Sequence, residues 1–383
     1  MSDMTPRISI DQVWKVFGEH PERALDDHCQ SMDAEQLHNQ TGLKAAVRDV
    51  TLSISSGEIF VVMGLSGSGK STLLRMINGL ILPTGGEVSV DGKPITQLAA
   101  AELQKLRSNK MAMVFQSFAL FPQRTALENA AFGLEVAGVP RQKRLEKARE
   151  ALERVGLGKD LDRLPQQLSG GMQQRVGLAR ALALDPPILL MDEAFSALDP
   201  LIRREMQEQL LELQAESPRT IVFISHDLDE AVRLGDRIAL MKEGKVLQCG
   251  TPRELLCKPA NEQVRHFFQD VDAASVITVD TVAESPARLI NQSDLRQLQI
   301  EGVTAIEAPT YIVDDRNIFK GVLQKNGKII PAETGPALIA ETTIRDAMKS
   351  VANAPYPVPV IGSDQRLIGV ISPRRLLRSM ILR

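Results

Sequence analysis

Residues 62–79 have the sequence "VMGLSGSGKSTLLRMING", in which a glycine-rich turn follows an apolar run and precedes a helical pattern. Gly64, Gly69, Lys70 and Ser71 match the pattern G-x-x-x-x-G-K-[ST]. Consecutive backbone N–H groups of such a turn can hold phosphate oxygens, and Cβ atoms would prevent the close approach that this requires. A glycine-rich turn without a ligand is the alternative, but the strand pattern before it and the helix pattern after it favour a phosphate site.

The residues at the end of the turn predict that the phosphate belongs to a nucleotide. Lys70 is expected to reach the β- and γ-phosphates, and the hydroxyl of Ser71 to ligate Mg²⁺. The helix that begins near Gly69 directs its positive end toward the anion. The predicted nucleotide-binding residues of this phosphate loop are Gly64, Ser66, Gly67, Gly69, Lys70, Ser71 and Thr72.

Composition and charge exclude several other classes of protein. The chain has 383 residues, enough for two or three domains, and its net charge of −3 argues against nucleic-acid binding. Its three cysteines, Cys29, Cys249 and Cys257, lack the spacing of a zinc site and are expected to be free thiols. No signal-peptide pattern and no apolar run of about 20 residues is present, so we expect a cytoplasmic protein that reaches a membrane only through a partner.

The coarse secondary structure predicts an α/β core. Two apolar runs, "PILLM" (187–191) and "TIVFI" (220–224), are typical of buried parallel strands, and a helical pattern at 200–216 lies between them. A hairpin is expected at 237–251. The patterns from about 97 to 168 are mostly helical.

An acidic pair ends the first of these buried strands in "ILLMDE" (188–193). Asp192 can hold Mg²⁺ directly or through water, and Glu193 can polarise an attacking water as a general base. The alternative is two surface acids after a strand, which the four preceding apolar residues disfavour. A third motif, "LSGGMQQR" (168–175), opens a helix with Ser169, Gly170 and Gly171 and predicts a second anion-binding turn that lacks a lysine.

The order of these motifs carries a resemblance to a known family. "GLSGSGKST", "VFQSF", "LSGGMQQR", "ILLMDE", "SALD" and "ISHD" follow one another as in the ATP-binding cassette of ABC transporters, over about residues 8–250. The resemblance implies a RecA-like P-loop α/β cassette, with a helical subdomain at about residues 117–180, that binds ATP and Mg²⁺ and hydrolyses ATP.

The same resemblance implies roles for further residues. Gln116 resembles the residue that meets Mg²⁺ and water and reports to the membrane subunit. His226 resembles the switch histidine that contacts the γ-phosphate and helps Glu193, although a histidine satisfied within the core is the alternative. Asp199 resembles the loop residue that organises the dimer interface.

Ser169 and Gly171 resemble the signature contacts to the γ-phosphate of the opposite protomer. The family therefore implies a head-to-tail homodimer of cassettes with two ATP molecules between them. The family also stacks an aromatic side chain on adenine near the N-terminus. Phe17 matches that place and is favoured over Trp14, while core packing is the alternative for either ring.

Residues 19–44 form an insertion relative to compact cassettes. Within it, Asp33, Gln36 and Gly42 predict a short capped helix. The insertion, "VFQSFALFPQRTALENAAFGLEVAG" and "MDEAFSALDPLIRREMQ" resemble the ATPase subunits of glycine betaine/proline/choline importers. That branch implies a membrane permease and a periplasmic or extracellular substrate-binding protein as partners, and a position at the cytoplasmic face of the inner membrane. Import of another small solute, or export, is the nearest alternative.

The last part of the chain, residues 273–383, is expected to be a separate α+β domain after a cassette at 1–272. "YPVPVIGSDQRLIGVISPRRLLRSM" (356–380) and "PTYIVDDRNIFKGVLQKNG" (309–327) resemble two copies of a CBS motif. Both copies lack the aspartate that the resemblance places on the ribose, which argues against adenosine binding. The tail is expected either to sense ionic strength or an anionic surface, or to serve in dimerisation or packing; the candidate sensing residues are Arg374, Arg375, Arg378 and Arg383.

Two functions of other classes remain as rivals. One is an ABC protein that acts on ribosomes or DNA, which the single cassette and the absence of a long heptad pattern disfavour. The other is a nucleotide sensor with an inactive ATPase site. The presence of Lys70, Asp192, Glu193 and His226 disfavours the sensor.

Overall fold

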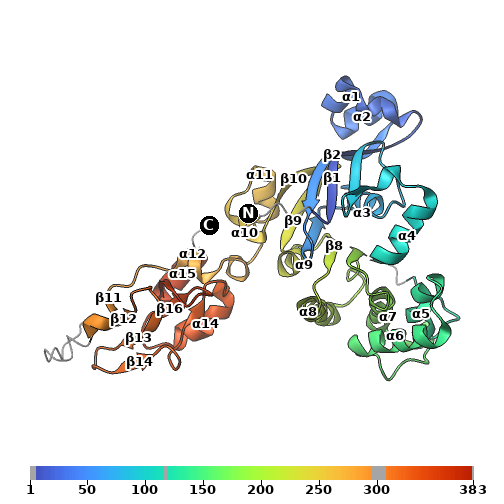
Figure 1. Ribbon diagram of the computed structural model, residues 1–383. Helices are drawn as coiled ribbons and strands as arrows, with labels where there is room; N and C mark the ends of the chain where they lie inside the picture. Colours follow the sequence, from blue (N-terminus) through green and yellow to red (C-terminus); the bar gives the residue numbers. More distant parts are fainter. Residues whose placement is uncertain (1–5, 116–118, 296–307, 382–383) are drawn as a thin grey trace. The chain divides into compact units, whose positions relative to one another are not determined.

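The computed structural model describes residues 6–115, 119–295 and 308–381 (Figure 1). The chain divides into two compact units, Met1–Gln269 and Asp270–Arg383. We describe each unit by itself.

The centre of the first unit is a six-stranded sheet in the order β10-β9-β3-β8-β7-β6. All neighbouring pairs are parallel except β10 and β9, which form the predicted hairpin. Strands β3, β7 and β8 are buried throughout, because helices and the second sheet cover both faces of a parallel sheet. The strands are β3 (Ile59–Met63), β6 (Met111–Val114), β7 (Ile188–Asp192), β8 (Thr220–Ser225), β9 (Arg237–Lys242) and β10 (Lys245–Gly250).

Strand β6 lies within the region from 97 to 168, whose patterns are mostly helical. The four residues "MAMV" pair in parallel with β7, from Met111 opposite Ile188 to Val114 opposite Met191. So short a segment shows no period of its own, and its neighbour in the sheet decides its conformation.

A second, antiparallel sheet has the order β2-β1-β4-β5. Apolar side chains of both sheets and of the helix after β3 share one core, which includes Ile10, Phe60, Leu73, Val88 and Leu190. This core anchors the loops at the carboxyl ends of the parallel strands. The elements are β1 (Ile8–Phe17), β2 (Lys44–Ile54), β4 (Gly85–Val90), β5 (Lys93–Pro94) and α3 (Lys70–Ile77).

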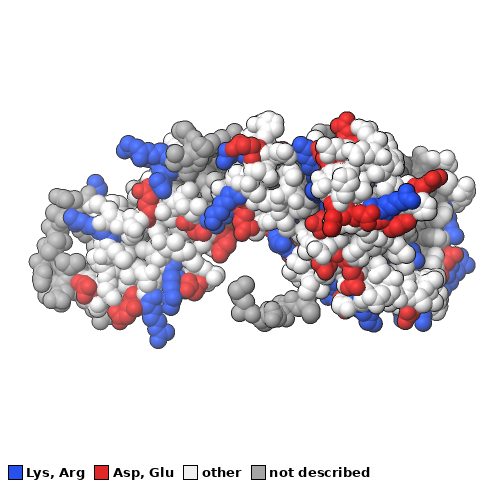
Figure 2. Space-filling model, turned by 90° about the horizontal axis from the view of Figure 1, so that it is seen from above, with Lys and Arg blue, Asp and Glu red and all other residues white. Residues whose placement is uncertain are grey.

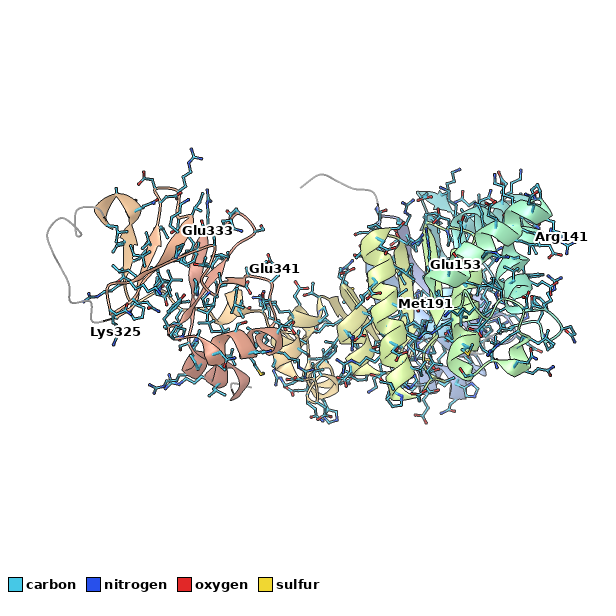
Figure 3. All side chains as sticks on the ribbon, turned by 90° about the horizontal axis from the view of Figure 1, so that it is seen from below. Arg141, Glu153, Met191, Lys325, Glu333 and Glu341 are labelled. Carbon is cyan, nitrogen blue, oxygen red and sulfur yellow. The ribbon has the colours of Figure 1, made fainter. Side chains whose placement is uncertain are left out.

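Three helices, α5 (Ala126–Val136), α6 (Arg141–Arg154) and α7 (Gly170–Leu182), pack together beside the sheets. They fall in the region predicted as the helical subdomain. Figure 3 labels Arg141 and Glu153 on the outer helix α6 and Met191 in the central sheet. Other helices of this unit are η2 (Ile95–Gln97), α4 (Ala100–Lys110), η3 (Pro165–Gln167), α8 (Pro200–Glu216), α9 (Leu228–Leu234), α10 (Pro252–Cys257) and α11 (Glu262–Phe267).

The insertion between β1 and β2 forms a small helical layer of η1 (Pro21–Leu25), α1 (Asp27–Ser31) and α2 (Ala34–Thr41). The predicted capped helix is confirmed, since Asp33 and Gln36 form a reciprocal capping box and Gly42 ends the helix with φ of 71°. Met32, Leu37 and Leu43 pack against Trp14 of β1 in a cluster of their own.

The second unit contains two similar arrangements of strands. In each, a parallel pair is followed by an antiparallel hairpin: β11 with β12 and β13, and β15 with β16 and β17. The two hairpin turns lie side by side, because Phe319 N–H donates to Gln365 O and Leu367 N–H donates to Asn317 O, both at 3.0 Å. The first copy adds β14 where the second continues into α15. The strands are β11 (Leu289–Asn291), β12 (Thr310–Val313), β13 (Phe319–Leu323), β14 (Ile329–Pro331), β15 (Leu338–Ile339), β16 (Val358–Ile361) and β17 (Leu367–Ile371); the helices are η4 (Ala273–Ser275), α12 (Val279–Val282), α14 (Ile344–Asn353) and α15 (Pro373–Ile381).

Charged side chains of both signs are interspersed on the face that Figure 2 shows. None of the helices in the described part of the chain has the length and apolar character needed to span a bilayer.

Candidate functional site

The phosphate loop connects β3 to α3, and two of its glycines are required by the chain itself. At Gly64, with φ of 154°, a Cβ atom would lie 2.2 Å from the carbonyl oxygen of Met241; at Gly69, with φ of 99°, it would lie 2.1 Å from that of Ala46. The predicted reason for these glycines was access for phosphate. The structure adds a second one, because the loop packs directly against the backbone of β9 and β2.

Other predicted residues of the loop occupy its tip and the first turn of α3. Ser66 and Gly67 are exposed, and Gly67 adopts φ of 80°, where an L side chain is strained. Ser71 and Thr72 are half-buried in the first turn of the helix. The loop therefore offers backbone and hydroxyl groups around an open tip.

Lys70 is almost fully buried, with 4% of its surface exposed. Its Nζ donates to the carbonyl oxygens of Gly64 at 2.8 Å and Leu65 at 3.0 Å, and it lies 4.0 Å from Glu193 Oε1. Burial lowers the pKa of the Lys70 ammonium, and the nearby carboxylates of Glu193 and Asp192 oppose that shift. The ammonium is thus held inside the loop by carbonyls that a phosphate oxygen could replace as partners.

Ser71 and Asp192 face one another across the carboxyl edge of the sheet. Ser71 Oγ donates to Asp192 Oδ1 at 2.8 Å, and Asp192 is the buried last residue of β7. Hydroxyl and carboxylate oxygens are ligands that Mg²⁺ prefers. Among the residues that the structure describes, no cluster of three or more His, Cys, Asp or Glu side chains could hold a metal alone. The pair therefore offers two oxygen ligands of the kind that a magnesium ion takes. The predicted third ligand, Gln116, lies outside the described residues.

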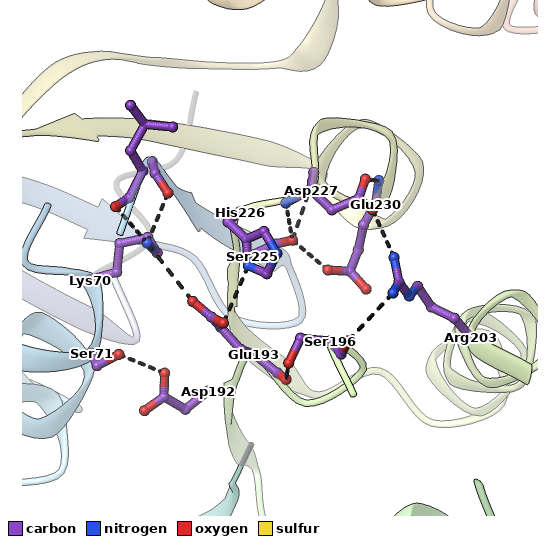
Figure 4. Close-up of polar contacts among 12 residues, drawn as sticks. Lys70, Ser71, Asp192, Glu193, Ser196, Arg203, Ser225, His226, Asp227 and Glu230 are labelled. Atoms are coloured by element: carbon purple, nitrogen blue, oxygen red, sulfur yellow. Dashed lines mark hydrogen bonds and ion pairs between the residues drawn. The ribbon is translucent and has the colours of Figure 1, made fainter. Parts of the chain in front are cut away.

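Glu193 follows Asp192 and is held in a strained conformation, with φ of 46°. Its N–H donates to Ile224 O at 3.2 Å, and its carbonyl accepts from Ser196 Oγ at 2.9 Å. Its Oε2 lies 3.2 Å from His226 Nδ1 (Figure 4). His226 is 54% exposed, so the alternative of a histidine buried in the core is excluded.

The "LSGGMQQR" motif begins helix α7, which packs with α5 and α6 and lies away from the phosphate loop of the same chain (Figure 1). Ser169 caps the helix, its Oγ accepting from Met172 N–H at 3.3 Å, and Gly170 is the first helical residue. A Cβ atom at Gly171 would lie 2.6 Å from Ile202 Cγ2. A pocket of about 210 Å³ is lined in part by Ser169, Gly171 and Arg175.

The remaining predicted residues differ in their surroundings. Phe17 ends β1 with 43% of its surface exposed, whereas Trp14 is packed in the core of the insertion at 6%. Lys15 Nζ lies 5.2 Å from the centroid of the Phe17 ring. Asp199 caps helix α8, its Oδ1 accepting from the N–H groups of Leu201 and Ile202 at 3.2 Å.

A second group of polar residues, which was not predicted, lies next to the segment that contains His226. Arg203 and Gln207 on α8 contact Asp227 and Glu230 on the next strand–helix connection. The spacing D-x-x-E from Asp227 to Glu230, a helix-start pattern, was the available signal. Arg48, buried beneath the insertion with its guanidinium donating to Met32 O, was also missed.

A P-loop nucleotide-binding cassette is the class that this fold and site define. The family model for the ABC transporter matches residues 47–196. The glycine betaine/proline betaine transport system ATP-binding protein ProV of Escherichia coli is 48% identical over 396 residues, covering 98% of this chain and 98% of that protein. The chain therefore belongs to the ABC transporter family of ATP-binding proteins, which are ATPases.

Other similar proteins are also named as ATP-binding proteins of transport systems. The choline transport ATP-binding protein OpuBA of Bacillus subtilis is 35% identical and covers 88% of this chain and 92% of its own length. The trimethylamine N-oxide transport system ATP-binding protein TmoW of Ruegeria pomeroyi is 50% identical over 73% of this chain and 82% of its own length. Among solved structures, the dimeric cassette MJ0796 has a TM-score of 0.55 and 35% identity, covering 64% of this chain and 98% of its own.

Proposed function

We propose that this chain is the ATPase subunit of an importer for quaternary amines, and that it drives a separate membrane permease. The observation that carries the proposal is the 48% identity to a glycine betaine/proline betaine ATP-binding protein over 98% of both chains. That span includes the insertion and the second unit, which lie outside the part matched by the general family model. Glycine betaine, choline, carnitine and proline betaine share a fully substituted, methylated nitrogen.

A related small solute is the second candidate cargo. The relative TmoW, named for trimethylamine N-oxide transport, is 50% identical over 73% of this chain. In that solute the nitrogen carries three methyl groups and an oxide oxygen in place of a fourth carbon, so the two candidates share the methylated, formally positive nitrogen and differ in its fourth substituent.

In the proposed nucleotide site, the phosphate loop and Lys70 bind the phosphates of ATP, with help from Ser66, Gly67 and Thr72. Lys70 exchanges its contacts with Gly64 O and Leu65 O for phosphate oxygens. The exposure of Phe17 supports stacking of its ring on the adenine, which would contribute about 1–3 kcal/mol. Trp14 is unsuited to that role because it is packed beneath the insertion.

Ser71, Asp192 and Gln116 are the residues that would hold Mg²⁺. The ion would supply positive charge that stabilises the transferring phosphoryl group. The 2.8 Å contact between Ser71 Oγ and Asp192 Oδ1 supports the first two as its ligands.

Glu193 acts as the general base and takes a proton from the attacking water. Its Oε2 lies 3.2 Å from His226 Nδ1 and its Oε1 lies 4.0 Å from Lys70 Nζ, so the carboxyl group lies beside the residue that binds the phosphates. His226 also donates toward the γ-phosphate. General-base catalysis of this kind contributes about 10²- to 10⁴-fold to the rate.

The signature residues Ser169, Gly170 and Gly171 act on the ATP of a second copy of the chain. They lie at the N-terminus of α7, apart from the phosphate loop, which supports their binding an ATP other than the one that this loop binds. Asp199 lies in the loop that meets the partner protomer. ATP then holds two cassettes together, and loss of the γ-phosphate lets them part.

The chain is divided into a cassette at 1–272 and a CBS pair at 273–383. The repeated strand order of the second unit supports the pair. Two functions of the pair remain open: sensing of ionic strength or an anionic surface, and dimerisation or packing. Arg374 and Arg378 are exposed, whereas Arg375 Nε donates to Val282 O at 2.9 Å, so the first two are the better candidates for sensing.

The two functions of the tail are separable by salt. Sensing predicts that transport by the full chain responds to salt more than transport by a chain truncated after residue 272, because salt screens exposed charges over about 8–10 Å. Packing predicts equal responses.

The chain acts at the cytoplasmic face of the inner membrane, attached through the permease. A periplasmic or extracellular binding protein delivers the cargo.

The proposed function is tested by uptake of labelled glycine betaine in cells that lack this chain and are complemented with it. Excess unlabelled choline, carnitine, proline betaine, trimethylamine N-oxide or alanine serves as the competitor. Restored uptake that methylated amines but not alanine inhibit supports the proposal. Absence of restored uptake, with an active ATPase, contradicts the proposed cargo.

A further inference from the structure

The two residues that flank His226 are linked to side chains of helix α8, Asp227 directly and Ser225 through Glu230 of α9. Asp227 accepts from Arg203 Nη1 through Oδ2 at 3.0 Å. Ser225 Oγ contacts Glu230 and accepts from the N–H of Asp227 at 2.9 Å. Gln207 Nε2 donates to Glu230 Oε1 at 3.1 Å. Helix α8 thus contacts Asp227 through Arg203 (Figure 4) and Glu230 through Gln207.

Arg203 also reaches the loop that leads into α8. Its Nη2 donates to Leu198 O at 3.1 Å and to Ser196 O at 3.5 Å. Ser196 Oγ in turn donates to Glu193 O at 2.9 Å. One guanidinium thus joins the loop at residues 196–199 to Asp227, and both ends of this connection adjoin a residue of the Glu193–His226 pair.

The connection is partly enclosed, and its deeper half is buried. Gln207 and Glu230 are 6% and 5% exposed, and the Arg203 side chain is 27% exposed. Burial raises the pKa of the Glu230 carboxyl. A charge-assisted contact in such a site constrains geometry more than an exposed surface pair does.

We propose that Arg203 is a positioning residue, which sets His226 against Glu193 and links that geometry to the loop at 196–199. The inference rests on the proposed roles of Glu193 and His226. His226 itself is largely exposed, so its placement depends on its neighbours in the chain. Because Arg203 holds Asp227 and the 196–199 loop at once, a shift of that loop moves the backbone next to His226.

The structure offers a matched control on the same two helices. Arg233 Nη2 on α9 contacts Glu208 Oε1 on α8 at 2.7 Å, also as an arginine–carboxylate pair between these helices. That pair does not include a neighbour of His226. Arg203→Met and Arg233→Met therefore each remove an arginine–carboxylate pair between α8 and the segment that follows β8. Only Arg203→Met removes a contact with the residue next to His226.

The experiment measures ATP hydrolysis, ATP affinity and thermal unfolding of the purified full chain. Arg203→Met is expected to lower kcat about tenfold or more, since small misplacements of catalytic groups are costly, and to leave ATP affinity within about twofold. Arg203→Lys, which can still reach Asp227, is expected to recover part of the loss. Arg233→Met is expected to stay within about twofold of wild type in kcat.

Coupling between the two partners gives a second readout. Asp227→Asn keeps a helix-capping oxygen and removes the charge, and the double variant with Arg203→Met should lose no more activity than the worse single variant. A kcat for Arg203→Met equal to that of Arg233→Met would overturn the inference, as would additive losses in the double variant. Absence of hydrolysis by the wild-type chain would instead contradict the proposed function.

Discussion

His226 Nδ1 lies 3.2 Å from Glu193 Oε2, although the two residues follow different strands of the central sheet. Glu193 follows β7 and His226 follows β8, which are parallel neighbours. The carboxyl ends of adjacent parallel strands meet at one edge of a sheet, where open α/β folds place their ligand sites. The order of the strands therefore places the two residues side by side. The carboxylate of Glu193 also lies 4.0 Å from Lys70 Nζ of the phosphate loop.

Replacing Glu193 with Gln removes the proposed base and keeps the shape of the side chain. We expect ATP hydrolysis by the purified chain to fall about 10²- to 10⁴-fold, while ATP still binds. Phosphate release and nucleotide affinity are the measurements. Near-normal turnover would show that another group accepts the proton.

Replacing Lys70 with Ala acts on a different step. The ammonium lies inside the phosphate loop and is expected to bind the β- and γ-phosphates, so ATP affinity itself should fall. The exposed Lys143→Ala on α6 is the control and should bind ATP as wild type does. Equal affinity in the two variants would remove the phosphate role of Lys70.

Glu230 predicts a dependence of stability on pH. Its pKa is raised above the ordinary value of 4.5 by burial. The unfolded chain releases this proton at lower pH than the folded chain does, so the free energy of unfolding decreases as pH rises through the raised pKa. Glu230→Gln should lose this part of the decrease.

Urea unfolding from pH 4.5 to about 8 measures the effect for wild type and for Glu230→Gln. The exposed Glu212→Gln on the same helix as Gln207 serves as the control, and should follow wild type. A difference between wild type and Glu230→Gln that is constant over the whole range would count against a raised pKa.

Arg48 predicts a strong effect on stability, because it is 2% exposed beneath the insertion. Its guanidinium donates to Met32 O and lies 5.8 Å from the Trp14 ring centroid. Arg48→Ala leaves a cavity and an unpaired carbonyl, so we expect a loss of about 2–4 kcal/mol in the free energy of unfolding. The exposed Arg141→Ala should change it by less than about 0.5 kcal/mol. Denaturant unfolding compares the two, and equal small effects would contradict the role of Arg48 in holding the insertion.

Most elements that carry the motifs were predictable because their signals are local. Strands β7 and β8 are continuous apolar runs, α8 begins at the Asp199–Pro200 cap, and the helix from Ala34 is bounded by its own capping residues. The contact between Glu193 and His226 was predicted only from the resemblance to a family, because their separation in the sequence does not indicate that they lie together.

The rest depended on contacts between distant segments. β6 is a strand because it pairs with β7, and Arg48 is buried because an insertion covers it. The role of Arg203 could not be predicted from the local sequence, because its partners lie on the loop before α8 and on the segment after β8. The clashes that exclude a side chain at Gly64 and Gly69 likewise involve carbonyls of other strands.

The most direct test of the central claim is uptake of labelled glycine betaine in cells that lack this chain. The cells are complemented with wild type or with Glu193→Gln, and the amount of each protein at the membrane is matched. We expect wild type to restore uptake and Glu193→Gln, present at the same level, to leave uptake unrestored. Equal uptake with the two chains would contradict the claim that hydrolysis assisted by Glu193 drives import.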